Sequence, residues 1–167
     1  MSSQIKDLNI VQSRAIVFNS KNELLLVSKN GTRWSLPGGT VNKHYQLDQL
    51  AADEVFEETG LSVKVNYLAY YLQEKCDVNN GFWHFNERIE HPFTAHCLVL
   101  AYYCEIIGNE NLDPNWIDKD HNVIKFKKFV NESEFLDLLL NKNIAQDELL
   151  ELTFQKIKRL KNQHLFI

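Results

Sequence analysis

The sequence has few cysteines and no apolar run long enough to cross a membrane. Its three cysteines are an odd number in 167 residues and lack metal-ligand spacing, so we expect neither a disulfide framework nor a cysteine metal site. They are Cys76, Cys97 and Cys104. The longest apolar run, CLVLAYYCEII at 97–107, is too short for a bilayer, and the initial MSSQIKDLNI lacks the apolar segment of a signal peptide. We therefore expect a cytoplasmic protein without a membrane segment.

Basic charge is not in excess either. Lys and Arg number 18 against 22 Asp and Glu, and the formal net charge is −4, so nucleic acid is not an expected partner. Hydrophobic residues make up 44% of the chain, which is ordinary for a globular protein. A chain of 167 residues is long enough for one full core. Because it shows no repeat, low-complexity segment or linker, residues 1–167 are expected to form a single domain.

The spacing of apolar residues predicts a mixed fold. Alternating or continuous apolar segments predict strands, and helical spacing predicts helices. The expected strands cover 13–19, 23–29, 61–76, 95–107 and 122–130, and the expected helices cover 46–59, 132–142 and 146–161. Strands outnumber helices without a regular βαβ alternation, so the sequence predicts an α/β sandwich with a mixed sheet.

Two segments without a regular pattern separate these elements. Pro37, Gly38 and Gly39 are turn-forming residues and predict a loop ahead of the first helix. The segment 77–94 is predicted to be irregular and is long enough to serve a function.

The helix expected at 46–59 gathers carboxylates beside its apolar stripe. Its stretch ADEVFEETG carries Asp53, Glu54, Glu57 and Glu58. Since each residue turns a helix by about 100°, the three glutamates share a face whose centre lies about 40° from that of the apolar stripe. Like charges at this spacing cost about 0.2–0.5 kcal/mol per pair, and no lysine or arginine lies within one turn. A solvated acidic face is the ordinary explanation, but a bound divalent cation would remove the repulsion.

The loop and the acidic helix together resemble the signature of the Nudix (MutT-like) family. That signature reads Gx5Ex7REUxEExGU, where U is a bulky aliphatic residue. It would begin here at Gly39 and end at Leu61, which keeps the family spacing, and the preceding WSLPGG is also similar to the family. The order of the expected elements suits the family over nearly the whole chain. The resemblance implies a Nudix-like α/β/α sandwich.

Two positions depart from that signature. Tyr45 stands where the family has its first glutamate, and Asp53 stands where it has an arginine. In the family this arginine helps to brace the loop and helix and to hold the glutamates. A cation beside acids offsets their repulsion, whereas Asp53 adds a negative charge one turn before Glu57.

The resemblance implies that Glu54, Glu57 and Glu58 are catalytic residues and metal ligands. Their oxygen donors suit Mg²⁺, with Mn²⁺ as an alternative. The backbone carbonyl of Gly38 is a further candidate ligand, because glycine permits a close backbone approach. A purely structural turn explains Gly38 and its neighbour almost as well.

The segment 77–94 holds four candidate substrate-binding residues. Trp83 and Phe85 could stack on a base, although packing of the segment onto the core is the simpler explanation. Glu87 and Glu90 are carboxylates outside the signature, where some Nudix enzymes place a base or an extra metal ligand. For these two glutamates, a solvated loop charge is the alternative.

The resemblance implies an enzyme, a metal-dependent pyrophosphohydrolase that cleaves a diphosphate linkage in a nucleoside diphosphate derivative. Its partner would be a nucleotide-type small molecule. The alternative is a nucleotide-binding or sensing module with weak or no catalysis, which the changes at Tyr45 and Asp53 keep open. The sequence does not set the oligomeric state, and a homodimer is one option.

Overall fold

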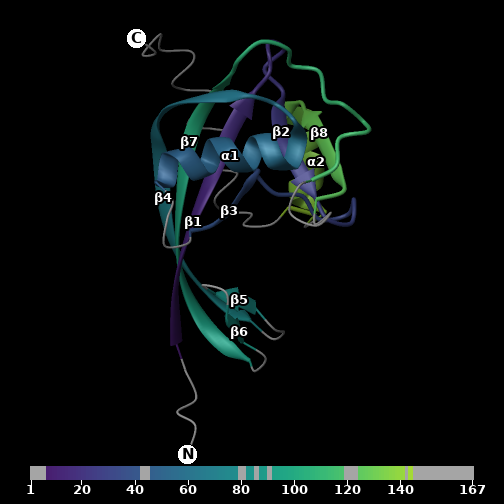
Figure 1. The fold of residues 1–167 in the computed structure, drawn as a ribbon. Helices are drawn as coiled ribbons and strands as arrows, with labels where there is room; N and C mark the ends of the chain where they lie inside the picture. Colours follow the sequence, from purple (N-terminus) through teal and green to yellow (C-terminus); the bar gives the residue numbers. More distant parts are fainter. Residues whose placement is uncertain are drawn as a thin grey trace, which may run out of the picture.

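A six-stranded mixed sheet organises the described part of the computed structural model, which covers residues 7–41, 46–78, 82–84, 87–89, 92–118, 124–141 and 143–144. The strands are β1 (Asp7–Phe18), β2 (Leu24–Ser28), β3 (Gly38–Thr40), β4 (Val63–Val78), β7 (Phe93–Ile106) and β8 (Phe126–Val130). The order is β4-β7-β1-β2-β8, and β3 pairs with β1 (Figure 1). β1 and β7 are parallel, while the β1–β2, β2–β8 and β4–β7 pairs are antiparallel. The predicted mixed sheet is therefore confirmed.

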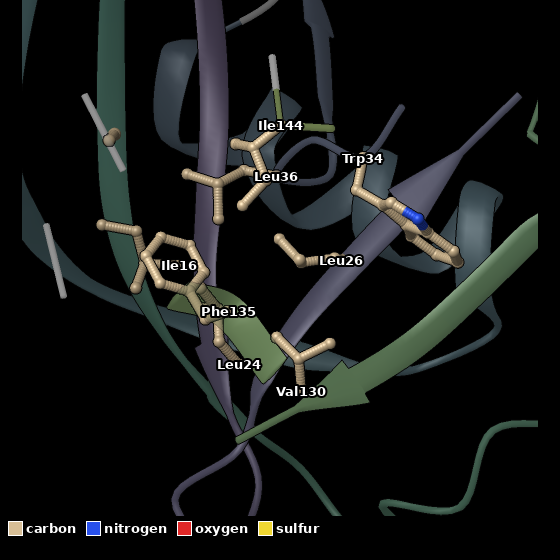
Figure 2. Packing of buried hydrophobic residues seen from close by; sticks show 9 residues of the cluster. Ile16, Leu24, Leu26, Trp34, Leu36, Val130, Phe135 and Ile144 are labelled. Carbon is tan, nitrogen blue, oxygen red and sulfur yellow. The ribbon is translucent and has the colours of Figure 1, made fainter. Parts of the chain in front are cut away.

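Two helices, α1 (Leu47–Thr59) and α2 (Glu132–Leu140), pack on opposite faces of this sheet. Figure 1 shows α1 crossing one face over β7, β1 and β2. Ala15 and Val17 of β1 pack with Val55 of α1, whereas Ile16 packs with Phe135 of α2 (Figure 2). Alternate residues of a strand point to opposite faces, so β1 supplies both cores. The α/β/α sandwich is confirmed.

Helix α1 has a weak start and a clear end. Gln46, the residue before its first turn, makes no side-chain capping hydrogen bond. At the other end Gly60 adopts a left-handed conformation with φ of 80°, and its N–H donates to the carbonyl oxygen of Phe56 at 2.9 Å. Leu61 then turns into the core beside Val55. The predicted helix is confirmed to within one residue.

Helix α2 begins with a capping box. Asn131 accepts a hydrogen bond from the backbone N–H of Glu134, and the Glu134 carboxylate accepts one from the N–H of Asn131. The helix ends two residues earlier than the predicted 132–142. The helix predicted at 146–161 lies outside the described residues.

Among the helices that the structure describes, none has the length and apolar character needed to cross a membrane.

Two predictions about irregular segments are wrong. Gly38 and Gly39, expected in a loop, belong to β3 because their backbone pairs with β1. Within 77–94, β4 continues to Val78, and β5 (Phe82–His84) pairs with β6 (Glu87–Ile89) in a separate antiparallel hairpin. The misses at β3, β5 and β6 have one cause: strands of three residues are formed by backbone pairing with a neighbour and leave no alternating pattern in the sequence.

Candidate active site

The short strand β3 lies against β1 and beside α1, and its two glycines allow the close approach. In the register of the sheet, Ser13 faces Gly39 and Arg14 faces Gly38. A β-carbon on Gly38, whose φ is 147°, would overlap the carbonyl oxygen of Ser13. A β-carbon on Gly39 would overlap Oε1 of Glu54 and lie 2.6 Å from its Cδ atom. Glycine at both positions thus brings the strand backbone into contact with a carboxylate of α1.

Glu58 is a buried carboxylate at the end of α1. Its side chain is 8% exposed, and its Oε2 atom accepts a hydrogen bond of 3.1 Å from the backbone N–H of Gly38. Burial, and then the negative charge of Glu54, raise the pKa of Glu58 well above its ordinary value, and Asp118 adds to the rise. The positive charge of Arg14 and the Gly38 hydrogen bond act in the opposite direction. Added positive charge here would favour the ionised carboxylate.

Glu54 and Glu57 are half-buried. Together with buried Glu58, they lie beside the apolar stripe of α1, as the helical spacing predicts. The backbone carbonyl of Glu57 accepts a hydrogen bond of 2.9 Å from the indole N–H of Trp116. The Trp116 ring also meets Phe56 edge to face, with 5.2 Å between ring centroids. The segment that follows β7 therefore fixes the last turn of α1, which carries Glu57 and Glu58.

Arg14 and Ser13 reach the same region from β1, and neither was among the residues predicted from the sequence. Nη1 of Arg14 donates to the carbonyl oxygens of Gly38 at 2.8 Å and of Leu36 at 3.4 Å. The fully buried Ser13 donates from its hydroxyl to the carbonyl oxygen of Leu47 at 2.6 Å, which ties β1 to the first turn of α1. The available signal was two polar residues, Ser13 and Arg14, at the head of the apolar segment SRAIVFN.

Of the two departures from the family signature, the structure describes Asp53 but not Tyr45. Oδ1 of Asp53 accepts a hydrogen bond of 2.8 Å from the side-chain amide of Gln49, one turn earlier on α1. Tyr45 lies outside the described residues. Asp53 is thus hydrogen-bonded within its own helix, and the cation whose charge acts on Glu58, Arg14, belongs to β1.

The carboxylates fit a magnesium site that substrate would complete. Within the described residues, no group of three or more His, Cys, Asp or Glu side chains is placed to hold a metal ion. Magnesium in proteins is often bound by only one or two carboxylates, with water and substrate phosphate in the other positions. Glu54 and Glu58 supply such a pair, because Glu54 lies against Gly39 and Glu58 accepts a hydrogen bond from the N–H of the preceding residue, Gly38. The donor set therefore fits Mg²⁺ or Mn²⁺ without an all-protein cage.

The four candidate substrate-binding residues belong to the β5–β6 region. Trp83 lies in β5 and Glu87 in β6, where Trp83 pairs with Arg88 across the hairpin. The side chains of Trp83 and Glu87 are not described. Phe85 and Glu90 lie outside the described residues. The roles of all four residues stay predictions.

The chain matches one family model, and its fold is similar to those of solved structures. The family model of the NUDIX domain matches residues 9–152. A NUDIX hydrolase from Nitrosomonas europaea is similar in structure, with a TM-score of 0.62 and 19% identity over 93% of this chain and 90% of that chain. The MutT protein of Methanosarcina mazei Go1 gives a TM-score of 0.54 and 20% identity over 97% and 99% of the two chains.

A third solved structure, described as a UDP-X diphosphatase, gives a TM-score of 0.52 and 23% identity over 94% of this chain and 66% of that chain. At these identities the structural likeness shows the fold alone. No curated protein sequence matches the chain.

Proposed function

Because the chain belongs to the Nudix family, we propose that it is a pyrophosphohydrolase that cleaves the diphosphate linkage of a nucleoside diphosphate derivative, with Mg²⁺ or Mn²⁺ as cofactor. The observation that carries the proposal is the position of Glu58. A carboxylate on a solvated acidic face would be exposed, whereas Glu58 is 8% exposed and has a raised pKa. Burial of a carboxylate is costly unless a partner offsets its charge. A divalent cation would be such a partner.

We propose that Glu54, Glu57 and Glu58 form the catalytic and metal-binding set. The cation would neutralise charge on the diphosphate and lower the pKa of a bound water. Glu58 accepts a hydrogen bond from the Gly38 N–H, and Glu54 packs against Gly39, so both carboxylates would lie beside β3 before substrate arrives.

The carbonyl oxygen of Gly38 remains a proposed ligand in addition to these carboxylates. It already accepts a hydrogen bond from Arg14. A carbonyl oxygen has two lone pairs, and the second would be the one offered to the cation.

The substrate class proposed is a nucleoside diphosphate linked to a further group. One neighbour in fold is described as a UDP-X diphosphatase, which supports testing this class first. The proposed contacts to the nucleotide come from Trp83 and Phe85 by stacking, and from Glu87 and Glu90 as carboxylates outside the signature. We further propose that residues 1–167 act as one domain in the cytoplasm.

A substrate panel tests the function directly. The purified protein would be incubated with nucleoside diphosphate sugars, nucleoside triphosphates and dinucleoside polyphosphates, each with Mg²⁺, with Mn²⁺ and with chelator. The expected result is release of a nucleoside monophosphate from at least one diphosphate-linked compound, dependent on the metal. Failure of every compound with both metals would overturn the proposal.

A nucleotide-binding module without catalysis is the second candidate, and Asp53 favours it. The carboxylate of Asp53 occupies the signature position of the family arginine and is bonded to Gln49. The same panel separates the two functions. A binding module would show a nucleotide-dependent rise in melting temperature without product, whereas the enzyme would form product.

A further inference from the structure

A cation on an element outside the family signature binds the glycine that holds Glu58 of α1. Arg14 lies in β1, directly opposite Gly38 of β3. We propose that Arg14 is the positioning residue that holds β3 against Glu58, in the role that the signature arginine would fill at Asp53. This inference rests on the proposed function, because it assigns Arg14 to the same site.

The hydrogen bonds of Gly38 link Arg14 to Glu58. On one side, the Gly38 carbonyl accepts a bond of 2.8 Å from Nη1 of Arg14. On the other, the Gly38 N–H donates a bond of 3.1 Å to Oε2 of Glu58. A shift of β3 would therefore break or lengthen both bonds together. The position of the Glu58 carboxylate depends on this arginine through one glycine.

The guanidinium of Arg14 is shaped for this task. The same Nη1 atom also approaches the carbonyl oxygen of Leu36 at 3.4 Å, and Nη2 donates to Oε1 of Gln12 at 3.0 Å. These contacts set Arg14 within its own strand and against the segment that leads into β3. A planar fork of donors can hold several acceptors in fixed directions, whereas the ammonium of lysine is one compact charge.

The charge of Arg14 also acts on the carboxylate. It lowers the pKa of Glu58, against the effects of burial and of Glu54. Asp53 can supply neither a positive charge nor a guanidinium donor, and its carboxylate is bonded to Gln49 instead. Arg14 thus provides both the positive charge and the loop contact that are missing at the signature position.

A positioning role predicts a particular split of kinetic effects. Arg14 donates hydrogen bonds to the backbone carbonyls of Leu36 and Gly38 and to the side chain of Gln12. Loss of its side chain should therefore reduce kcat and metal affinity by about 10–100-fold, the usual range for residues that orient ligands. The KM for the nucleotide should stay within about threefold, because Arg14 is not assigned a substrate contact.

The test compares three variants in the full-length protein. Arg14→Met removes the charge and the donors at similar length, and Arg14→Lys keeps the charge. Arg33→Met is the matched control, since Arg33 is an exposed arginine. The measurements are kcat, KM, melting temperature and the binding of Mn²⁺ alone without nucleotide. We expect losses of kcat and Mn²⁺ affinity of about 10–100-fold in Arg14→Met, smaller losses in Arg14→Lys, whose ammonium lacks the fork of donors, and wild-type values in Arg33→Met.

A second-site change tests the equivalence with the signature position. Asp53→Arg would return a cation to α1. In the Arg14→Met background it should therefore raise kcat at least about tenfold over Arg14→Met alone, which is within the range expected for an orienting residue. If the two positions perform one role, the kcat of the double variant, relative to wild type, will be higher than the product of the relative kcat values of the two single variants.

Clear outcomes would overturn the inference. One is an Arg14→Met protein with wild-type kcat and Mn²⁺ affinity, and another is a loss confined to KM, which would make Arg14 a substrate contact. If Arg14→Met does not fold, Arg14→Lys decides, and wild-type kcat and Mn²⁺ binding in that variant would reject the role. If the wild-type protein hydrolyses nothing, the proposed function fails, while the Mn²⁺ comparison still tests Arg14.

Discussion

Gly39 and Glu54 are in such close contact that any β-carbon on the glycine would overlap Oε1 of the carboxylate. The overlap involves the far end of a flexible side chain, so Gly39→Ala should displace Glu54 while leaving the fold in place. We predict a loss of hydrolysis of about 10–100-fold, with a free energy of unfolding within about 1 kcal/mol of wild type. Steady-state kinetics and urea unfolding of the same preparation would measure both.

Gly38→Ala is the informative contrast. Its β-carbon would overlap the backbone oxygen of Ser13, which cannot rotate away, and the φ of Gly38 is 147°. This variant should lose at least about 1–3 kcal/mol of stability. If Gly39→Ala were destabilised as much as Gly38→Ala, Gly39 would be a packing residue and the claim about Glu54 would fail.

The proposed carboxylates make a second prediction. Glu54→Gln, Glu57→Gln and Glu58→Gln each keep the side-chain shape and remove the charge, so each should lower metal-dependent turnover by about 10²-fold or more with a folded protein. Glu105→Gln, a change at an exposed glutamate of β7, is the matched control and should be near wild type. Near-normal turnover in both Glu57→Gln and Glu58→Gln would remove the metal site from this face of α1.

The acidic face of α1 and the mixed content of strands and helices could be predicted because both depend on local periodicity, whereas the α/β/α layering was implied by the resemblance to the Nudix family. The apolar spacing predicted the bounds of α1 to within one residue, and Gly60 indicated where the helix ends. The role of Arg14 left no such pattern, because its bonds to Leu36 and Gly38 join residues that are 22 and 24 positions away. Side-chain bonds to backbone carbonyls do not constrain the residue types of their acceptors.

The same reason explains the strands that were missed. β3 forms because glycines pair with β1, and β1 starts at Asp7 rather than at the predicted 13 because β7 pairs along its whole length. These partners lie far apart in the sequence. Periodicity therefore identified the elements with a buried face, whereas pairing with distant strands formed β3 and set the start of β1.

Metal binding makes a third prediction, which needs no substrate. A ligand that binds only the folded protein stabilises it by RT ln(1 + [L]/Kd), or about 2.7 kcal/mol at a hundredfold excess over Kd. For a domain of this size that corresponds to a rise of roughly 5–10 °C. Scanning calorimetry with Mn²⁺, Mg²⁺ and chelator would record it. No rise at millimolar metal, or an equal rise in the Glu54→Gln/Glu58→Gln double variant, would count against the site.

The last prediction concerns the pH dependence of the metal-free protein. Burial, and then the charge of Glu54, raise the pKa of Glu58 in the folded state. In the unfolded chain this glutamate titrates near pH 4.3. Between that pH and its higher folded pKa, the folded protein holds a proton that the unfolded chain has released. Stability rises with pH only where the unfolded state binds more protons, so this carboxyl makes the free energy of unfolding fall as pH rises through the window.

Glu58→Gln isolates that contribution, because glutamine is neutral at every pH. Urea unfolding in chelator from pH 4 to 8 should show a stability difference between Glu58→Gln and wild type that is smallest at the acidic end. The difference should then grow in favour of the variant as pH rises through the window. Glu105→Gln should track wild type throughout. Added Mn²⁺ should reverse the difference, because the cation stabilises the ionised Glu58 carboxylate and glutamine supplies no charge for it. Parallel curves for Glu58→Gln and Glu105→Gln would mean that the buried carboxylate carries no uncompensated charge, and the argument for a cation at this position would lose its basis.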